Sequence, residues 1–302
     1  MSQLSAPADA SALSAPGGPR PTSFMDRLSD TLINPRSIWM YVLLLLGVLM
    51  VVSIITNDLY KQAFEFLVEG VQITITVSVS AFILAQILGL TTALARISKN
   101  MVAYNIATFY VEVVRGIPII VQLIYMALVI FPALVTTFNN VGNAMTESGV
   151  PFLVGLGESM VAARIRDVPM EIRAVLGLAI AYGAFESEVY RAGIESIDRG
   201  QMEAARSLGM TYVQAMRYVI LPQAIRRVLP PIGNDFVAIL KDSSLVSVLA
   251  VNDLTQKGNL HRARTCRAFE TWNTVTFLYL ILTISFTRLV RWLERRFSTN
   301  DQ

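Results

Sequence analysis

The sequence predicts an all-α polytopic membrane protein with about six transmembrane helices. Hydrophobic residues make up 54% of the 302 residues, and the mean hydropathy is +0.53. These values are too apolar for an ordinary soluble domain, and the apolar residues are gathered in blocks long enough to cross a bilayer. Lys and Arg are placed beside these blocks, which is typical of the ends of membrane spans.

Charge and composition exclude several other classes of protein. The formal charge of +3 and the pI of about 9.1 would suggest nucleic acid as a partner of a soluble chain. Here the basic residues flank apolar blocks, so we predict no nucleic-acid partner. The only cysteine, Cys266, excludes an intramolecular disulfide and any multi-cysteine metal site. The only histidine, His261, lies in a polar stretch where we expect it to be solvated, so we predict no metal site.

The N-terminal part divides into a tail, a first span and a second span. Residues 1–37 are rich in Ser, Ala, Pro and Gly and are expected to form a disordered cytoplasmic tail. Residues 38–56 are expected to form an extra N-terminal transmembrane helix, and 57–66 a short external loop. The run 70–95 contains the strand-like alternation ITITVSVS. Because a lone strand in lipid cannot satisfy its backbone, we predict a helix there.

The middle of the chain contains a break and an insertion. Residues 101–115 are amphipathic, and Gly116-Ile117-Pro118 then interrupts the helical pattern before an apolar run to Phe131. Two interpretations remain open, an interfacial helix that turns into a span and a simple proline-kinked helix. Residues 135–173 are expected to be a partly helical external insertion, whose segment 150–163 is too short for a span.

The remaining spans set the predicted orientation. Apolar runs at 174–192, 233–251 and 271–290 complete the six, with both termini cytoplasmic. On this topology 16 of the Lys and Arg residues lie inside and 8 outside, and Lys241 lies in a span. This twofold bias supports the orientation. The basic stretch 257–267, which is predicted to be external, is its exception.

The loop 194–222 is the most informative part of the chain. Residues 194–208 contain good helix formers, and Gly209 can end a helix in a left-handed conformation. Thr211 and Gln214 have the spacing of a capping box at the start of a second helix, and Pro222 is expected to close the element. The predicted product is a compact helix–turn–helix knob that fits a socket on a soluble partner.

This loop carries a resemblance. Glu203-Ala204-Ala205, Gly209 and Leu221-Pro222 resemble the EAA loop of permease subunits in binding-protein-dependent ABC importers, with Val219 where isoleucine is usual. The flanking sequences are similar to the polar amino acid branch of these permeases, namely VRGIPIIVQL (114–123), GAFESEVYRAGI (183–194), LPQAIRRVLPPIGN (221–234) and ILKDSSLVSVLAV (239–251). The resemblance covers roughly residues 70–298 apart from the insertion 135–173, which departs from the family, and the permease domain is expected to span 67–298.

The resemblance implies a five-helix permease core, to which the helix at 38–56 is added. It also implies partners: a dimer of cytoplasmic ABC ATPases, a second permease subunit that is identical or different, an external amino acid binding protein, and the lipid of a prokaryotic plasma (inner) membrane. No phosphate-binding loop and no nucleophile paired with the lone histidine is found, so no catalytic residue or cofactor is predicted on this chain. ATP and Mg would be bound by the ATPase, which would dock at Glu203, Ala204, Ala205, Gly209, Leu221 and Pro222.

Polar residues within the spans are candidates for the transport path, because an intramembrane charge is costly and is usually paired or placed in a polar cavity. The candidates are Gln122, Glu186, Glu188, Lys241, Asp242, Ser243 and Ser244. Two structural alternatives stay open: Lys241 and Asp242 form a salt bridge that fixes packing, or the two glutamates contact cytoplasmic arginines. An ion channel or secondary transporter is the alternative function, and a membrane-embedded enzyme is a further rival. Neither gives the loop 194–222 a purpose.

Overall fold

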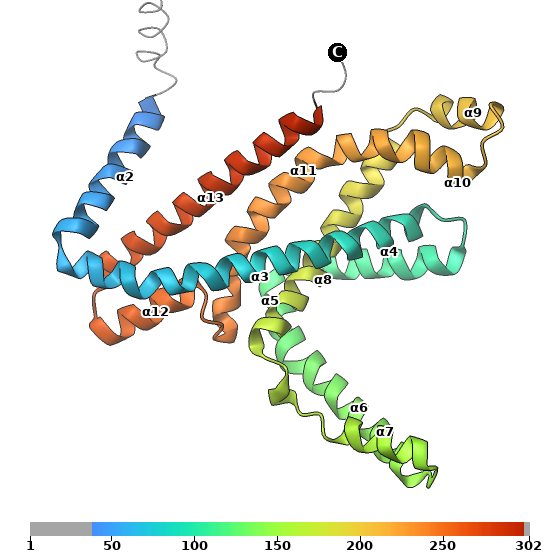
Figure 1. Cartoon of the computed structure of the whole chain (residues 1–302), viewed down its shortest axis with the longest axis horizontal. Helices are drawn as coiled ribbons and strands as arrows, with labels where there is room; N and C mark the ends of the chain where they lie inside the picture. Colours follow the sequence, from blue (N-terminus) through green and yellow to red (C-terminus); the bar gives the residue numbers. More distant parts are fainter. Residues whose placement is uncertain (1–37, 299–302) are drawn as a thin grey trace, which may run out of the picture. The chain divides into compact units, whose positions relative to one another are not determined.

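The computed structural model describes residues 38–298, and in this range all regular elements are helices, joined by short connections and without a β-strand (Figure 1). The elements, in order, are α2 (Ile38–Thr56), α3 (Asp58–Ile97), α4 (Met101–Arg115), α5 (Ile119–Tyr125), η2 (Met126–Ile130), α6 (Phe131–Glu147), α7 (Pro151–Val161), η3 (Ile165–Asp167), α8 (Met170–Glu195), α9 (Arg199–Ser207), α10 (Tyr212–Ala215), η4 (Met216–Ile220), α11 (Leu221–Asp242), η5 (Ser243–Leu249), α12 (Leu254–Thr265) and α13 (Ala268–Ser298). The tail expected at 1–37 lies outside the described residues.

Four helices of the described part are long and apolar enough to cross a membrane. They lie at Ile38–Thr56, Asp58–Ile97, Ile119–Glu147 and Ala268–Arg296. The all-α membrane fold and the helix expected at 38–56 are therefore confirmed. The span expected at 174–192 falls inside α8, which is not among these four because Glu186, Glu188 and Arg191 lie within this stretch.

The span expected at 233–251 is two elements instead of one helix. The α-helix α11 ends at Asp242, and a 3-10 helix, η5, follows to Leu249. The Ser243 hydroxyl donates to the Leu240 carbonyl at 2.8 Å, and Ala250 has a left-handed φ of 57° that stops the helix. The change to 3-10 winding and this left-handed residue end the α-helix early, which the apolar run alone did not indicate.

The helices α3 and α8 form the centre of the fold. Small residues let them approach closely: a Cβ atom placed on Gly89 would lie 2.5 Å from the Cβ of Glu186. Val77, Ala81 and Ala85 of α3 belong to the main buried cluster, which also contains Leu178 and Tyr182 of α8. The contact between these two helices positions the polar residues of α8 against α3.

The external loop expected at 57–66 is wrong, because α3 begins at Asp58. Asn57 caps this helix, its Oδ1 accepting from the Leu59 amide at 2.9 Å. Ala63 and Leu67 are buried in a cluster with Leu254 of α12 and with Val275 and Leu278 of α13. Because these packing partners lie about 200 residues away in the sequence, the local sequence of 57–66 did not indicate a helix.

Each of the two π-helical turns comes just before a proline. The turn η2 ends at Ile130, two residues before Pro132, and η4 ends at Ile220, two residues before Pro222. A wider π-turn accommodates a ring that has no N–H and that would clash in a regular α-helix. Pro222 therefore does not close the loop element as expected. It lies in the first turn of α11, and the helical path continues from α10.

The histidine expected to be solvated is buried. His261 lies in α12, is 6% exposed, and its Nδ1 is 2.7 Å from the Thr271 Oγ1. Burial lowers the pKa of His261, and the positive charge of Arg267 lowers it further. The polar composition of the stretch was misleading because α12 turns its histidine toward α13.

Candidate functional site

The first part of the loop 194–222 is a capped helix. The Asp198 side chain accepts from the Gly200 amide at 2.7 Å at the start of α9. At its end the Gly209 amide donates to the Arg206 carbonyl at 3.0 Å, and the Met210 amide donates to the Ala205 carbonyl at 3.2 Å. These two bonds form a Schellman motif, and Gly209 has the φ of +84° that the motif requires. The predicted left-handed turn is therefore confirmed.

The second part begins with the predicted capping box. The Thr211 hydroxyl accepts from the Gln214 amide at 3.3 Å, and the Gln214 Oε1 accepts from the Thr211 amide at 2.8 Å. Below this box, Ile194, Ile197, Ile220 and Ala224 form a small buried cluster. The cluster fixes α9 and α10 to the ends of α8 and α11. We call residues 198–218 the knob.

The predicted docking residues do not all face outward. Glu203, Ala204, Gly209 and Pro222 are exposed, Ala205 is 4% exposed, and Leu221 is partly buried against the cluster below the knob. Ala205 and Leu221 therefore hold the knob together. The knob also exposes four large apolar side chains that the sequence did not single out. They are Leu208, Tyr212, Val213 and Tyr218, which are 82%, 52%, 71% and 64% exposed, and Tyr212 also lines a cavity toward α3. We call these four residues the apolar patch.

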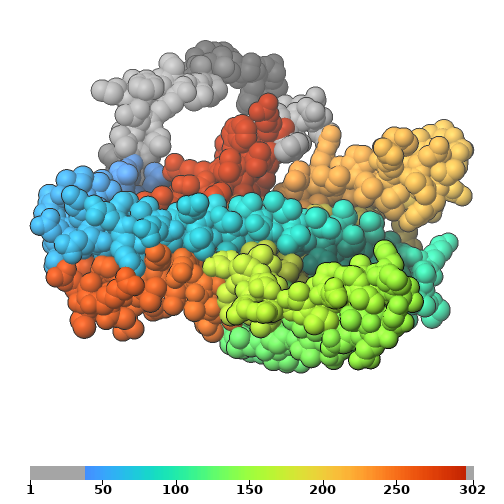
Figure 2. Space-filling view, turned by 60° about the horizontal axis from the view of Figure 1, so that its bottom comes forward, coloured from blue at the N-terminus to red at the C-terminus, as the bar shows by residue number. Residues whose placement is uncertain are grey.

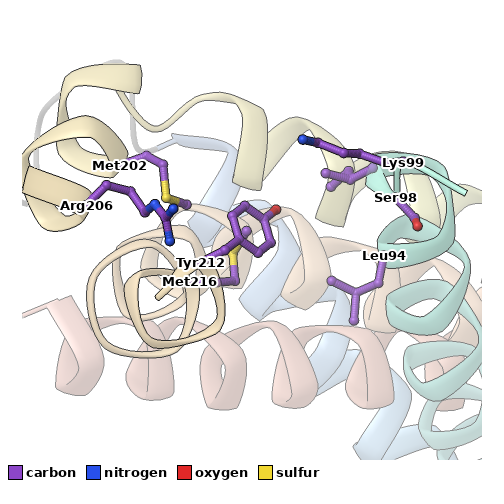
Figure 3. Close-up of a pocket in the computed structure, with 8 residues that line it drawn as sticks. Leu94, Ser98, Lys99, Met202, Arg206, Tyr212 and Met216 are labelled. Atoms are coloured by element: carbon purple, nitrogen blue, oxygen red, sulfur yellow. The ribbon is translucent and has the colours of Figure 1, made fainter. Parts of the chain in front are cut away.

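A cavity of ≈ 620 Å³ separates part of the knob from the end of α3 (Figure 3). It is lined by Leu94, Ile97, Ser98, Lys99, Met202, Arg206, Tyr212 and Met216. Met202 and Arg206 come from α9, and Tyr212 and Met216 from the second half of the knob. The knob therefore faces the end of α3 across this cavity, while Ile97 of α3 packs against the buried cluster below the knob.

Glu186 is the most enclosed of the predicted path residues. Its side chain is 0% exposed, and its Oε1 accepts from Gln86 Nε2 of α3 at 2.7 Å. The Tyr190 hydroxyl in turn donates to Gln86 Oε1 at 2.7 Å. The other carboxylate oxygen of Glu186 is buried and has no hydrogen-bond partner. A buried acceptor without a partner is costly and is typical of a site that a ligand or a proton completes.

Glu188 lies on a different side of α8, in a cluster of arginines. Its Oε1 is 2.7 Å from Arg96 Nη1 and 3.2 Å from Arg115 Nη1, and its Oε2 is 2.7 Å from Arg191 Nη2. The arginine contact expected as an alternative is thus present for Glu188. No such pair involves Glu186 within residues 38–298.

Asp242 is bound to α8 and not to its neighbour. The Tyr182 hydroxyl donates to Asp242 Oδ2 at 2.7 Å, while Lys241 is exposed. The described chain contains no ion pair between Lys241 and Asp242, so the salt-bridge alternative is wrong. The physical reason is helix geometry, since successive residues of a helix point about 100° apart.

The other predicted path residues mainly serve the backbone. Gln122 Nε2 donates to the carbonyls of Val114 and Ile117 at 2.6 and 2.7 Å, across the break that precedes Pro118. Ser243 donates to Leu240, and the Ser244 carbonyl accepts from the Ser247 hydroxyl at 2.7 Å. The break at 116–118 is complete, because Pro118 has an extended ψ of 138°.

The structure therefore brings together only part of the predicted path. Tyr182 and Glu186 are four residues apart on α8 and share one of its faces, so the Asp242 and Glu186 carboxylates belong to one surface. Glu188 faces elsewhere. The sequence reasoning missed Tyr182, Gln86 and Tyr190, because a phenol or an amide in an apolar run gives no distinctive signal until its partner is known.

Comparisons with known proteins agree with this architecture. Residues 86–299 match the family described as the binding-protein-dependent transport system inner membrane component. The chain is 34% identical over 234 residues to the glutamine transport system permease protein GlnP of Escherichia coli (strain K12), a match that covers 78% of this chain and 94% of that protein. It is 32% identical over 237 residues to the probable amino-acid permease protein YxeN of Bacillus subtilis (strain 168), with 78% and 93% covered. A solved structure, the crystal structure of an amino acid ABC transporter with histidines, aligns with a TM-score of 0.60 at 34% identity and covers 77% of this chain and 94% of that one.

Proposed function

Because the chain belongs to the family of binding-protein-dependent transport system inner membrane components, we propose that it is the permease subunit that forms the membrane path for polar amino acids in an ATP-driven importer. The observation that carries this proposal is the knob, a rigid, doubly capped loop whose exposed apolar patch has no function in an isolated membrane helix bundle. An ion channel or a secondary transporter has no use for such a docking element.

Polar amino acids are proposed as the cargo for two reasons. GlnP and YxeN, which are similar over most of their length, are named for glutamine and amino-acid transport. In addition, the carboxylates of Glu186 and Asp242 lie on one face of α8, where it packs on α3 and α11. An acidic group there is suited to the ammonium group that every amino acid carries. Glu188 is left out of this path, because three arginines already neutralise it.

Partners and placement follow from the same proposal. A dimer of cytoplasmic ATPases binds ATP and Mg and docks on the knob, a second permease subunit completes the path, and an external binding protein delivers the amino acid. The chain lies in a prokaryotic inner membrane with both termini in the cytoplasm. The excess of Lys and Arg on the side of the knob supports this orientation.

Leu208→Asp tests the docking proposal. Leu208 is 82% exposed, so an aspartate there does not disturb the packing of the permease. Placing a charge against an apolar pocket of the ATPase costs about 2 kcal/mol, which is roughly a 30-fold loss of affinity. We expect copurification of the ATPase with the permease to fall accordingly, while the permease remains folded.

The matched control is Gln201→Asp, which adds the same charge at an exposed polar position of α9. We expect this variant to retain the ATPase. Equal retention by both variants would show that the apolar patch is not the docking surface and would remove the main support for the proposed function.

A further inference from the structure

The helices α6 and α7 form a hairpin that stands apart from the rest of the described fold. In Figure 1 it runs on from α5 across the direction of α8 and α13, and in Figure 2 it stands at the surface, coloured green to yellow-green. Its two arms are packed closely, because a Cβ on Gly157 would lie 2.5 Å from the Gly142 carbonyl oxygen. The two helices therefore pack on each other as one hairpin, and the outer faces of the hairpin do not take part in this packing.

The hairpin has too few charges to project into water. Between residues 131 and 163 only Glu147 and Glu158 are charged, whereas about a quarter of the residues of an average soluble domain are charged. It also exposes large apolar side chains: Leu134, Phe138 and Val141 of α6 are 56%, 46% and 44% exposed, and Phe152 and Leu156 of α7 are 77% and 45% exposed.

These five side chains lie on one side of the hairpin. Leu134, Phe138 and Val141 have the spacing of a single helical stripe, as do Phe152 and Leu156. Gly142 of α6 and Gly157 of α7 face each other across the hairpin. At 100° per residue, both stripes are rotated away from these glycines in the same sense along the sequence. Because the two helices are antiparallel, the two stripes therefore lie on the same side of the hairpin. Among the exposed polar residues, Asn140, Asn143 and both charged residues, Glu147 and Glu158, lie on the opposite side, whereas the hydroxyl residues Thr137 and Ser159 lie on the apolar side.

The apolar side continues directly from a membrane span. The path from Ile119 through η2 to Glu147 is 29 residues of one long apolar helix, about 43 Å at the rise of an α-helix. A hydrocarbon core is about 30 Å thick, so the helix is longer than the core and its last part reaches the interface or beyond. At this depth a helix pair with one apolar and one polar side places its apolar side against lipid and leaves its polar side to water or protein.

We propose that the α6–α7 hairpin continues the span of α5 through the outer leaflet to the outer interface of the membrane, with Leu134, Phe138, Val141, Phe152 and Leu156 in contact with lipid. This proposal goes beyond the transport function. The contact with lipid does not depend on the proposed orientation of the chain, whereas the assignment to the outer leaflet does. The hairpin thus widens the footprint of the subunit in the outer leaflet. It is not a free-standing external domain.

Spin labels on single cysteines test this proposal in the complete transporter reconstituted in phospholipid vesicles. In a Cys266→Ser background, Val141→Cys and Phe152→Cys place the label on the apolar side, and Asn143→Cys and Glu158→Cys place it on the polar side of the same two helices. Collisions with oxygen report on lipid, and collisions with a water-soluble nickel chelate report on water. Collisions at the apolar pair should favour oxygen over the chelate several-fold more than at the polar pair.

The other outcomes overturn the proposal in distinguishable ways. Equal access of the chelate to all four labels would place the hairpin in water. Shielding of the apolar pair from both oxygen and chelate would mean that a protein, either the second permease or the binding protein, covers this side. A label on the natural Cys266, which is exposed, gives the orientation: the chelate added outside should reach it, and access only from the inside would overturn the outer placement. Amino acid uptake by the same vesicles is measured separately, so its loss would not be confused with these results.

Discussion

Gly89→Ala is expected to destabilise the permease strongly, although alanine is the better helix former. The added Cβ would lie 2.5 Å from the Glu186 Cβ and 3.1 Å from backbone atoms of Glu186 and Ser187. Backbone atoms cannot turn away as a side chain can, so α3 and α8 must separate at the centre of the fold. Overpacking costs about 1–3 kcal/mol, and the backbone contacts place Gly89→Ala at the upper end of this range, above the gain of about 1 kcal/mol in helix propensity.

Gly155→Ala is the matched control for this substitution. Gly155 is also inside a helix, but its added Cβ meets nothing within 4 Å. The same propensity gain is therefore not opposed, and thermal unfolding of the purified permease should occur at an equal or higher temperature than in the wild type. If Gly89→Ala unfolds like Gly155→Ala, the close approach of α3 and α8 is wrong.

Glu188→Gln is also expected to lower the stability of the permease strongly. Glu188 lies between Arg96, Arg115 and Arg191, and the Arg96 side chain is only 9% exposed. Removing one partner of a buried ion pair costs about 3–5 kcal/mol, because the charge left behind stays desolvated. Since Glu188 itself is 21% exposed, we expect about 3 kcal/mol, the lower end of this range.

Glu195→Gln separates this effect from an ordinary surface ion pair. Glu195 also pairs with Arg191, at 2.7 Å, but its side chain is 54% exposed. Exposed pairs contribute about 0–1 kcal/mol, so this variant should unfold close to the wild type. Adding Arg96→Met to Glu188→Gln removes the most buried charge and should restore part of the lost stability. Similar unfolding temperatures for the two single variants would contradict the burial of the arginine cluster.

The sequence predicted those features whose signals are local. The left-handed turn at Gly209 and the capping box of Thr211 and Gln214 were predictable because each depends on a few neighbouring residues. The apolar run of α2 was equally plain, since length and composition alone indicate a span. The EAA loop resemblance indicated the family for the same reason.

Features that depend on distant partners could not be predicted. The Glu186 partner, Gln86, lies 100 residues away, and the helical start of α3 depends on Leu254 and Val275. The pairing of Asp242 with Tyr182 in place of Lys241 likewise follows from how α11 packs on α8. The π-turns before Pro132 and Pro222 were missed because a proline normally predicts a helix end, and only the structure contains the wider turn that relieves the clash.

The measurement that tests the central claim most directly is amino acid uptake by vesicles that contain the complex of this chain, its ATPase and its binding protein. Labelled glutamine and other polar amino acids are supplied outside, with and without ATP inside. Our account predicts that at least one of them accumulates inside against its concentration gradient when ATP is present, and that none does without ATP. Entry without ATP, either down the gradient or driven by an ion gradient alone, would contradict the account and favour a channel or a secondary transporter.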